Sequence, residues 1–205
     1  MREQRLRIIH GAVEGLLDEV VLRRVIKHSH AEPGRIFGGN GKTHLLERLP
    51  GYNEAARLDP WVVLLDLDND ASCAPSLRTR VLAHPAEKMC FRIAVREIEA
   101  WLMGDVERLA AFLRVPSSRV SKQPEALSDP KRAMIDLAKR SRSRDIREDM
   151  VPRPESGRRV GPVYVGRLIE FVQDAAAGWR PEVAAGSSDS LRRCLRHLRR
   201  LAEQP

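Results

Sequence analysis

Two groups of acidic side chains each follow a short apolar run. Glu14 follows the run 6–13, and Asp66 and Asp68 follow the run 61–65. Both runs have the composition of buried parallel strands, so the carboxylates are expected at the carboxyl ends of strands, where open α/β sheets bind ligands. Carboxylates gathered at one edge repel each other unless a cation neutralises them, and hard cations such as Mg²⁺ prefer oxygen ligands. The sequence therefore predicts a metal-dependent site that acts on phosphate.

The spacing of these acids predicts that they converge. Asp66 and Asp68 are two residues apart and would share one face of a strand, whereas Glu14 and Asp18 are four apart and would share one face of a helix. If the two strands are neighbours, their ends lie about 5 Å apart. The four carboxylates are predicted metal ligands for one or two Mg²⁺ or Mn²⁺ ions, as in two-metal phosphoryl transfer, and Glu14, Asp66 and Asp68 are predicted catalytic residues.

Two later residues join the catalytic candidates. Glu99 lies in the predicted helix 97–103 beside its core-facing side, so it is either a further ligand or an exposed helix acid. Lys131 lies in the first turn of the helix that Asp129 and Pro130 begin. A cation there opposes the helix macrodipole, and this unfavourable placement suggests contact with phosphate.

The elements that must position these residues alternate in type over the first 95 positions. The predicted strands are 6–13, 35–37, 61–66 and 90–95, and the predicted helices between them are 17–30, 43–49 and 75–84. This order favours a largely parallel sheet with right-handed crossovers.

Beyond residue 95 the pattern is helical. The predicted helices are 97–103, 106–115, 129–139, 164–177 and 190–203, while the charged, Pro- and Gly-containing segment 140–162 is predicted to be a loop. The expected fold class is thus α/β. It comprises a Rossmann-like domain over residues 1–115, with a parallel sheet flanked by helices, and a basic helical extension over residues 116–205.

Charge and cysteine usage suggest partners and a compartment. The chain has 205 residues and a net charge of +8; residues 1–105 hold 15 basic and 15 acidic side chains, and residues 106–205 hold 21 and 13. A basic half beside an acidic site suits a nucleic acid, although a solvated Arg-rich surface explains the charge equally well. Three scattered cysteines, no signal-peptide pattern and no run of about 20 apolar residues lead us to expect a cytoplasmic protein.

Two familiar motifs fail on spacing. The segment Gly41-Lys42-Thr43 ends like a P-loop, but Ile36 stands where that motif needs its first glycine, so we interpret the segment as a turn and helix start. The acidic segment 66–77 is not an EF-hand loop, because Ala71 and Leu77 replace its required Gly and Glu.

The acidic motifs, Glu14-Gly15 and Asp66-Leu67-Asp68, resemble the TOPRIM fold of topoisomerases, bacterial primases and overcoming-lysogenization-defect (OLD) nucleases. Asp18 matches a second acid of the OLD-type enzymes. The segments 96–102 and 129–131 are similar to an uncharacterised TOPRIM-like bacterial family, domain of unknown function 4276, and the resemblance covers most of the chain. It implies a TOPRIM-like fold and a Mg²⁺-dependent nuclease that cleaves DNA or RNA. It also implies antiviral defence alongside an ABC-type ATPase.

Two functions remain open at this point. The first is a metal-dependent endonuclease, which the intact acids favour. The alternative is a catalytically silent, TOPRIM-derived subunit that binds an ATPase partner or nucleic acid. The chain lacks the sequence context of a gyrase-like catalytic tyrosine, which argues against a topoisomerase.

Overall fold

The computed structural model describes residues 6–204. The chain forms two compact units: one runs to Val95 and resumes at Ser190, and the other comprises Arg96–Asp189. Within the described residues, no helix is both long enough and apolar enough to cross a membrane.

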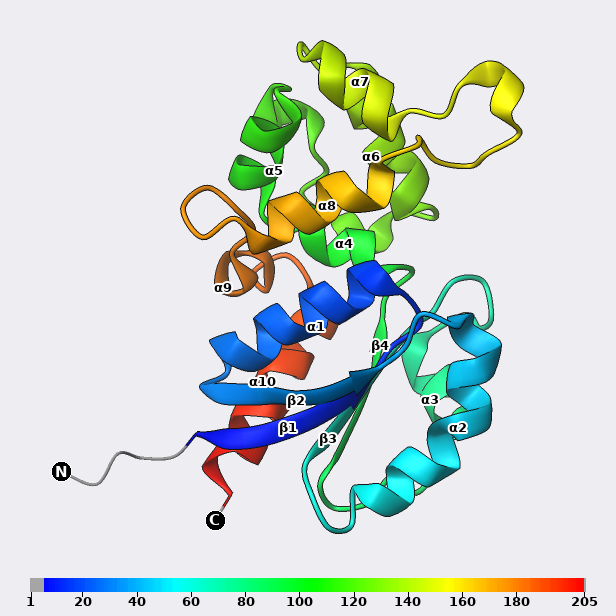
Figure 1. Ribbon diagram of the computed structural model, residues 1–205, viewed down its shortest axis with the longest axis vertical. Coiled ribbons are helices and arrows are strands. Elements are labelled where there is room, and N and C mark those ends of the chain that lie inside the picture. The colour runs from blue at the N-terminus through cyan, green and yellow to red at the C-terminus, as the bar shows by residue number, and fades with distance from the viewer. Residues whose placement is uncertain (1–5, 205) are drawn as a thin grey trace, which may run out of the picture. The chain divides into compact units, whose positions relative to one another are not determined.

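The first unit is built on a parallel sheet (Figure 1). Its strands are β1 (Arg7–Ala12), β2 (Ala31–Phe37), β3 (Trp61–Asp66) and β4 (Met89–Ala94), in the spatial order β2-β1-β3-β4. The predicted α/β class is confirmed, and the condition on which the acids were expected to converge is met, because β1 pairs with β3 in parallel. Their carboxyl ends therefore lie at one edge of the sheet.

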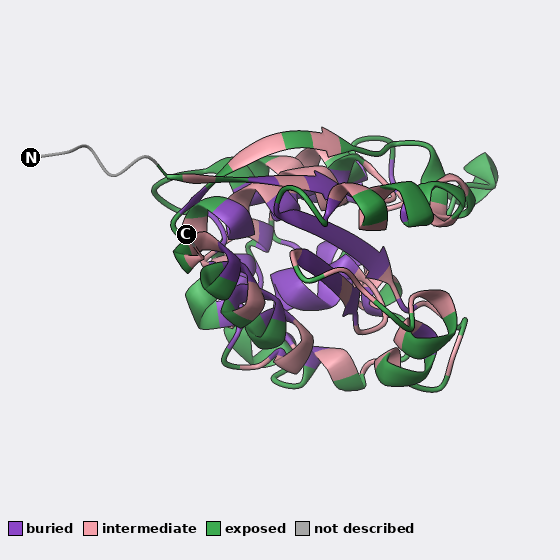
Figure 2. Cartoon of the chain, turned by 90° about the horizontal axis from the view of Figure 1, so that it is seen from below, coloured by how far each residue is buried: buried purple, intermediate pink, exposed green. Residues whose placement is uncertain are grey.

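Helices cover both faces of this sheet. They are α1 (Leu16–His28), α2 (Gly41–Ala55), α3 (Ala74–Val81) and α10 (Asp189–Glu203). In Figure 1, α1 and α10 lie on one side of the strands, and α2 and α3 lie on the other. Figure 2 shows the consequence, since the centre of the sheet is buried while the outer surfaces of the helices are exposed. On β3, the five residues before Asp66 are all buried, as expected of a central parallel strand.

Helix α2 is longer than its predicted range of 43–49. It continues to Ala55 and contains Pro50. Proline inside a helix removes one backbone hydrogen bond and destabilises it, so the packing of this helix must compensate. Leu45 and Leu49 bury against the sheet and hold this helix in place, so that Tyr52 becomes part of it.

The second unit is helical. Its helices are α4 (Ile98–Met103), α5 (Val106–Leu113), α6 (Pro130–Lys139), α7 (Arg144–Met150), α8 (Tyr164–Gln173) and α9 (Pro181–Ala184), with 3₁₀ turns at Ser117–Arg119, Pro124–Ala126 and Pro154–Ser156. The prediction of a loop over 140–162 is wrong, because it contains α7. The Ser143 side chain caps this helix, and only Ile146 and Met150 are buried, which is too short an apolar pattern to predict a helix.

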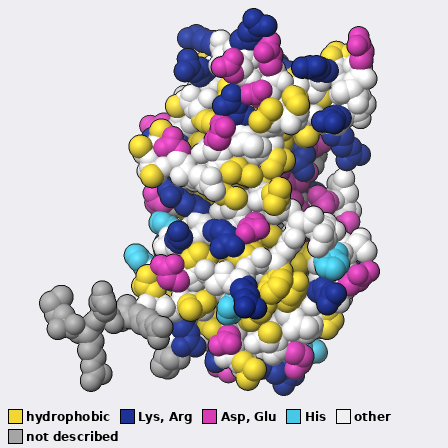
Figure 3. All heavy atoms as spheres, viewed as in Figure 1, with side chains coloured by type: hydrophobic (Ala, Val, Ile, Leu, Met, Phe, Trp, Pro, Cys, Tyr) yellow, Lys and Arg dark blue, Asp and Glu magenta, His cyan; other side chains and the backbone are white. Residues whose placement is uncertain are grey.

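The two compact units divide the chain after Val95 and before Ser190, whereas 115/116 is the boundary predicted from the sequence. The chain leaves the first unit after Val95, where the sheet ends, and α10 returns to it. Helix α10 buries one apolar stripe, comprising Leu191, Cys194, Leu195, Leu198 and Leu201. Its five arginines, at positions 192, 193, 196, 199 and 200, thus belong to the first unit rather than to a basic extension. On the face shown in Figure 3, basic and acidic side chains are interspersed, without one large basic patch.

We expect α10 to be an integral part of the first unit. Leu198 is fully buried, so Leu198→Ala should lower the free energy of unfolding by about 3 kcal/mol through lost burial and a residual cavity. Urea denaturation followed by circular dichroism measures this change. The exposed Arg196 on the same helix provides the control, because Arg196→Ala should change stability by less than about 0.5 kcal/mol. Equal effects of both variants would contradict the assignment of α10 to the core.

Candidate acidic site

The acidic site begins with a contact between the ends of β1 and β3. Glu14 lies two residues beyond β1, and its Oε1 accepts a hydrogen bond of 2.8 Å from the backbone N–H of Asp66, the last residue of β3. The structure therefore brings Glu14 and Asp66 together, as the parallel pairing of their strands predicts. Glu14 is mostly buried, with 17% of its side chain exposed.

Asp68 reaches the same edge by a different route from the predicted one. Strand β3 ends at Asp66, so the alternation of a strand does not continue to Asp68. Instead Leu67 is buried and Asp68 has a φ of 48°, in the left-handed region. Aspartate tolerates this region better than most residues, and such conformations recur at functional sites.

The most important side chain at this edge is Lys42, which the sequence analysis treated only as part of a helix start. Its Nζ donates hydrogen bonds to the backbone oxygen of Asp66 at 2.8 Å, to Asp70 Oδ2 at 2.8 Å and to Asp68 Oδ2. It also lies 3.9 Å from Glu14 Oε1. A single ammonium group thus stands where three carboxylates and a carbonyl oxygen converge. The sequence did contain a feature that could have identified Lys42. It is a lysine in the first turn of a helix that directly follows a strand, and such a turn lies at the carboxyl edge of the sheet.

The charges in this cluster perturb each other. Burial raises the pKa of Glu14 above its ordinary value, although the hydrogen bond from Asp66 and the charge of Lys42 oppose the rise. Burial alone would lower the pKa of Lys42, but its hydrogen bonds to Asp68 and Asp70 outweigh that effect, and the pKa is raised. Lys42 therefore remains charged at neutral pH and offsets the repulsion among the acids.

Asp18 has a structural contact. Its Oδ2 accepts a hydrogen bond of 2.8 Å from the backbone N–H of Gly15, the residue that caps α1. A carboxylate at this position satisfies an unpaired amide at the helix start and interacts favourably with the macrodipole. One oxygen of the predicted metal ligand is thus engaged in helix capping.

The donor set fits a hard divalent cation by its chemistry, because every group that converges on the Lys42 ammonium is an oxygen. The arrangement of the side chains differs from a ready-made metal site. Across residues 6–204, no group of three His, Cys, Asp or Glu side chains is arranged to hold a metal ion. The physical reason at this edge is that Lys42 already occupies the point of convergence, so a metal ion must displace its ammonium group.

Glu99 and Lys131 belong to a cluster within the second unit. Glu99 lies on α4, is only 2% exposed and accepts a hydrogen bond of 3.2 Å from the hydroxyl of Tyr164 at Oε1. Lys131 Nζ is 3.7 Å from the same oxygen. The other oxygen, Oε2, is buried without a hydrogen-bond partner among the described residues. Glu99 is thus not an exposed helix acid.

Lys131 is held by a neighbouring acid. Its backbone N–H donates to Glu97 Oε2 at 2.9 Å, and its Nζ donates to Glu97 Oε1 at 3.0 Å. Glu97 therefore lies at the start of α6, where a carboxylate compensates for the lysine that opposes the macrodipole. The position of Lys131 in the first turn of α6, which suggested contact with phosphate, is therefore explained by its contacts with Glu97 within this unit.

This second cluster generates a pH-dependent prediction. Burial raises the pKa of Glu99, with Glu97 adding to the rise and Lys131 and Tyr164 opposing it. A raised pKa means that the folded state disfavours the ionised form, so this group's contribution to stability is full at low pH and is lost as the pH rises through the folded pKa. The Tm of Glu99→Gln minus that of the wild type should therefore become more positive between about pH 4 and pH 8.

Scanning calorimetry across this range measures the difference. Glu148→Gln, on α7, is the matched control because its side chain is 57% exposed and its ion pair with Arg144 lies at the surface, where such pairs contribute little to stability. A Glu99→Gln difference that ignores pH would show that Glu99 is not destabilised by ionisation.

Comparison with known proteins does not assign the chain to a family. No family model matches it, and neither a curated protein nor a solved structure was found to match. The functional conclusion therefore rests on the geometry described above and on the resemblance of the acidic motifs.

Proposed function

We propose that the protein is a nuclease that depends on Mg²⁺ or Mn²⁺ and hydrolyses phosphodiester bonds of DNA or RNA. One observation carries the proposal: carboxylate oxygens of Glu14, Asp68 and Asp70 and the backbone oxygen of Asp66 converge on a single cationic group at the carboxyl edge of a parallel sheet. The TOPRIM-like motifs at the same residues add support. A divalent cation held by this donor set would polarise the phosphate and lower the pKa of a water molecule.

The residues of the chain would have distinct roles. Asp66, Asp68 and Glu14 would hold the cation. Lys42, whose side chain remains 19% exposed, would exchange its carboxylate partners for a phosphate oxygen of the substrate and stabilise the negative charge that develops there.

The wider role is proposed from the resemblance. We propose that the protein acts with an ABC-type ATPase in bacterial antiviral defence. A cytoplasmic location is also part of the proposal. It is supported by the three free cysteines, Cys73, Cys90 and Cys194, of the described chain.

A second candidate function is favoured by Lys42 itself. An ammonium group that permanently neutralises the acids would leave a TOPRIM-derived subunit without chemistry, which binds an ATPase or nucleic acid. In that case Lys42 would replace the metal ion as the structural cation of the site.

Metal titration distinguishes the two functions. If the site is metal-dependent, isothermal calorimetry should detect Mn²⁺ binding to the wild type, and Asp68→Asn should weaken it at least about tenfold, or about 1.4 kcal/mol, through loss of a charged ligand. Lys42→Met should strengthen binding by a similar factor because it removes the competing charge. Lys88→Met is the control, since Lys88 Nζ bonds the backbone oxygen of Leu58. Binding to Lys42→Met but not to the wild type would favour the silent subunit.

Cleavage provides the direct test. Purified protein with Mg²⁺ or Mn²⁺, with and without an ABC-type ATPase partner, should nick plasmid DNA or cut RNA, and Asp68→Asn should reduce the rate at least about a hundredfold through loss of electrostatic stabilisation. Asp59→Asn is the matched control because Asp59 is exposed and precedes the opposite end of β3. Cleavage by a folded Asp66→Asn, Asp68→Asn double variant would exclude this site as the source of activity.

A further inference from the structure

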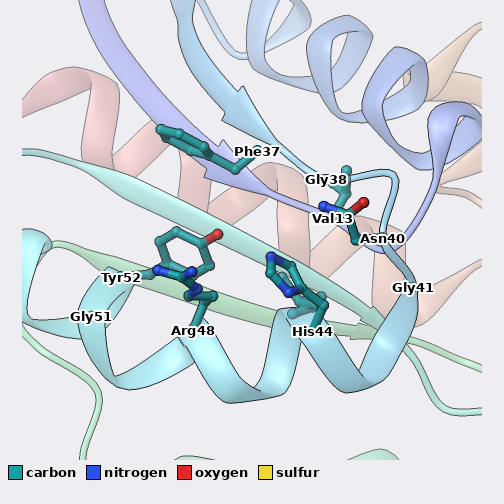
Figure 4. Close-up of a pocket in the computed structure, with 10 residues that line it drawn as sticks. Val13, Phe37, Gly38, Asn40, Gly41, His44, Arg48, Gly51 and Tyr52 are labelled. Carbon is teal, nitrogen blue, oxygen red and sulfur yellow. The ribbon is translucent and has the colours of Figure 1, made fainter.

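The first unit contains a pocket of about 520 Å³ between the end of β2, the loop that follows it and one side of α2. Figure 4 shows Phe37 on the strand side, and His44, Arg48 and Tyr52 projecting from the helix. This volume suits a small organic group, because ligand pockets commonly span about 300–1,000 Å³. None of these four side chains has a role in the acidic site.

One wall of the pocket is aromatic. Phe37 is 44% exposed, although it is large and apolar. Its ring lies 6.0 Å from that of Tyr52 and is stacked at 5.9 Å on Trp61, with 13° between the planes. The supporting rings hold Phe37 in place while part of it stays open to solvent. A ring supported in this way is a platform on which a planar, aromatic ligand can stack.

The other wall is basic. His44 and Arg48 are one helical turn apart on α2, and neither forms an ion pair or a hydrogen bond with another side chain in the described part of the chain. Burial raises the pKa of Tyr52, and the nearby positive charge of Arg48 partly opposes this rise. An arginine without an acidic partner in a pocket is suited to a phosphate group, which its planar guanidinium can bind through two hydrogen bonds.

The loop between the two walls leaves its backbone accessible. Gly39 and Gly41 have φ values of 89° and 79°, and no atom outside the adjoining residues lies within 4 Å of where a Cβ would stand at either position. A ligand can therefore approach the loop closely. The pocket is also continuous with the acidic site along the chain, since Val13 and Gly41 line it and directly precede Glu14 and Lys42.

From these observations we infer that the pocket binds one unpaired nucleotide of a single-stranded nucleic acid. Its base stacks on Phe37 and Tyr52, and its phosphate binds Arg48 and His44. The strand then continues towards the acidic site. This inference rests on the proposed function and specifies the substrate as single-stranded, because the bases of a duplex already stack on each other and offer no free face to Phe37.

Binding without cleavage tests the inference. Fluorescence anisotropy of a labelled single-stranded oligonucleotide in EDTA should detect binding by the wild type, and Phe37→Ala should weaken it by roughly tenfold to a hundredfold, the effect of losing one stacked base. Phe37→Trp should restore affinity because it preserves the stacking surface. Arg48→Ala should weaken binding and reduce the slope of log affinity against log salt by about one phosphate contact.

Matched controls come from the turn that follows the same helix. Leu58 is 76% exposed, and Arg57 forms an ion pair with Glu54 on the surface; neither lines the pocket. Leu58→Ala and Arg57→Ala should leave affinity within about twofold of the wild type. Circular dichroism confirms that each variant is folded.

The outcomes separate this inference from the proposed nuclease activity. Equal binding by Phe37→Ala and the wild type, tighter binding of the matching duplex, or equal affinity for a free mononucleotide would each overturn the single-strand pocket, even if metal-dependent cleavage persists. Absence of wild-type binding would overturn it as well. Conversely, binding that needs Phe37 and Arg48, without any cleavage, would support the pocket while the nuclease proposal fails.

Discussion

One hydrogen bond, from the N–H of Asp66 to the carboxylate of Glu14, determines the architecture of the acidic edge. Neighbouring parallel strands leave their sheet at the same edge, where backbone groups beyond the ladder must find other partners. Glu14 satisfies one of these groups and thereby fixes its own position beside β3. Its burial disfavours the charged form, so a carboxylate is retained there against an electrostatic cost. The compensating charge of Lys42 reduces that cost and draws Asp68 and Asp70 towards the same point.

The same arrangement makes Lys42 a competitor of any metal ion. A divalent cation has twice its charge, but it must first separate the ammonium group from its oxygen partners. An anionic phosphate would offer Lys42 new hydrogen-bond acceptors and lower the cost of that separation. Metal and phosphate binding should therefore favour each other, since by linkage each increases the affinity for the other by the same factor. A metal ion bound weakly in the absence of substrate is compatible with such a site.

The sequence predicted the features that depend on strand ends. Apolar runs locate the strands and place Glu14 and Asp66 at strand ends on one edge of a parallel sheet. Their meeting also requires the first and third strands to be neighbours, which the sequence left as a condition and the strand order supplies. Lys42 was missed because Gly41-Lys42-Thr43 was compared only with a phosphate-binding motif. The placement of α10 was missed for a more general reason: a leucine stripe shows that one side of a helix is buried, but it does not specify which surface covers it. Helical periodicity likewise does not predict ion pairs between different helices, such as the pair of Glu97 and Lys131.

The loop after β2 connects the acidic site with the aromatic and basic pocket. At Gly38, a Cβ would lie 2.6 Å from Cγ2 and 2.7 Å from the backbone oxygen of Val13, so the loop packs directly against the end of β1. The N–H of Gly41 donates to the backbone oxygen of Glu14 at 3.1 Å, which fixes the start of α2. Lys42 and Arg48 lie on this one helix and therefore share that anchor. A larger residue at position 38 would displace the helix start and disturb both sites together, which is the behaviour expected if a single strand of nucleic acid contacts both.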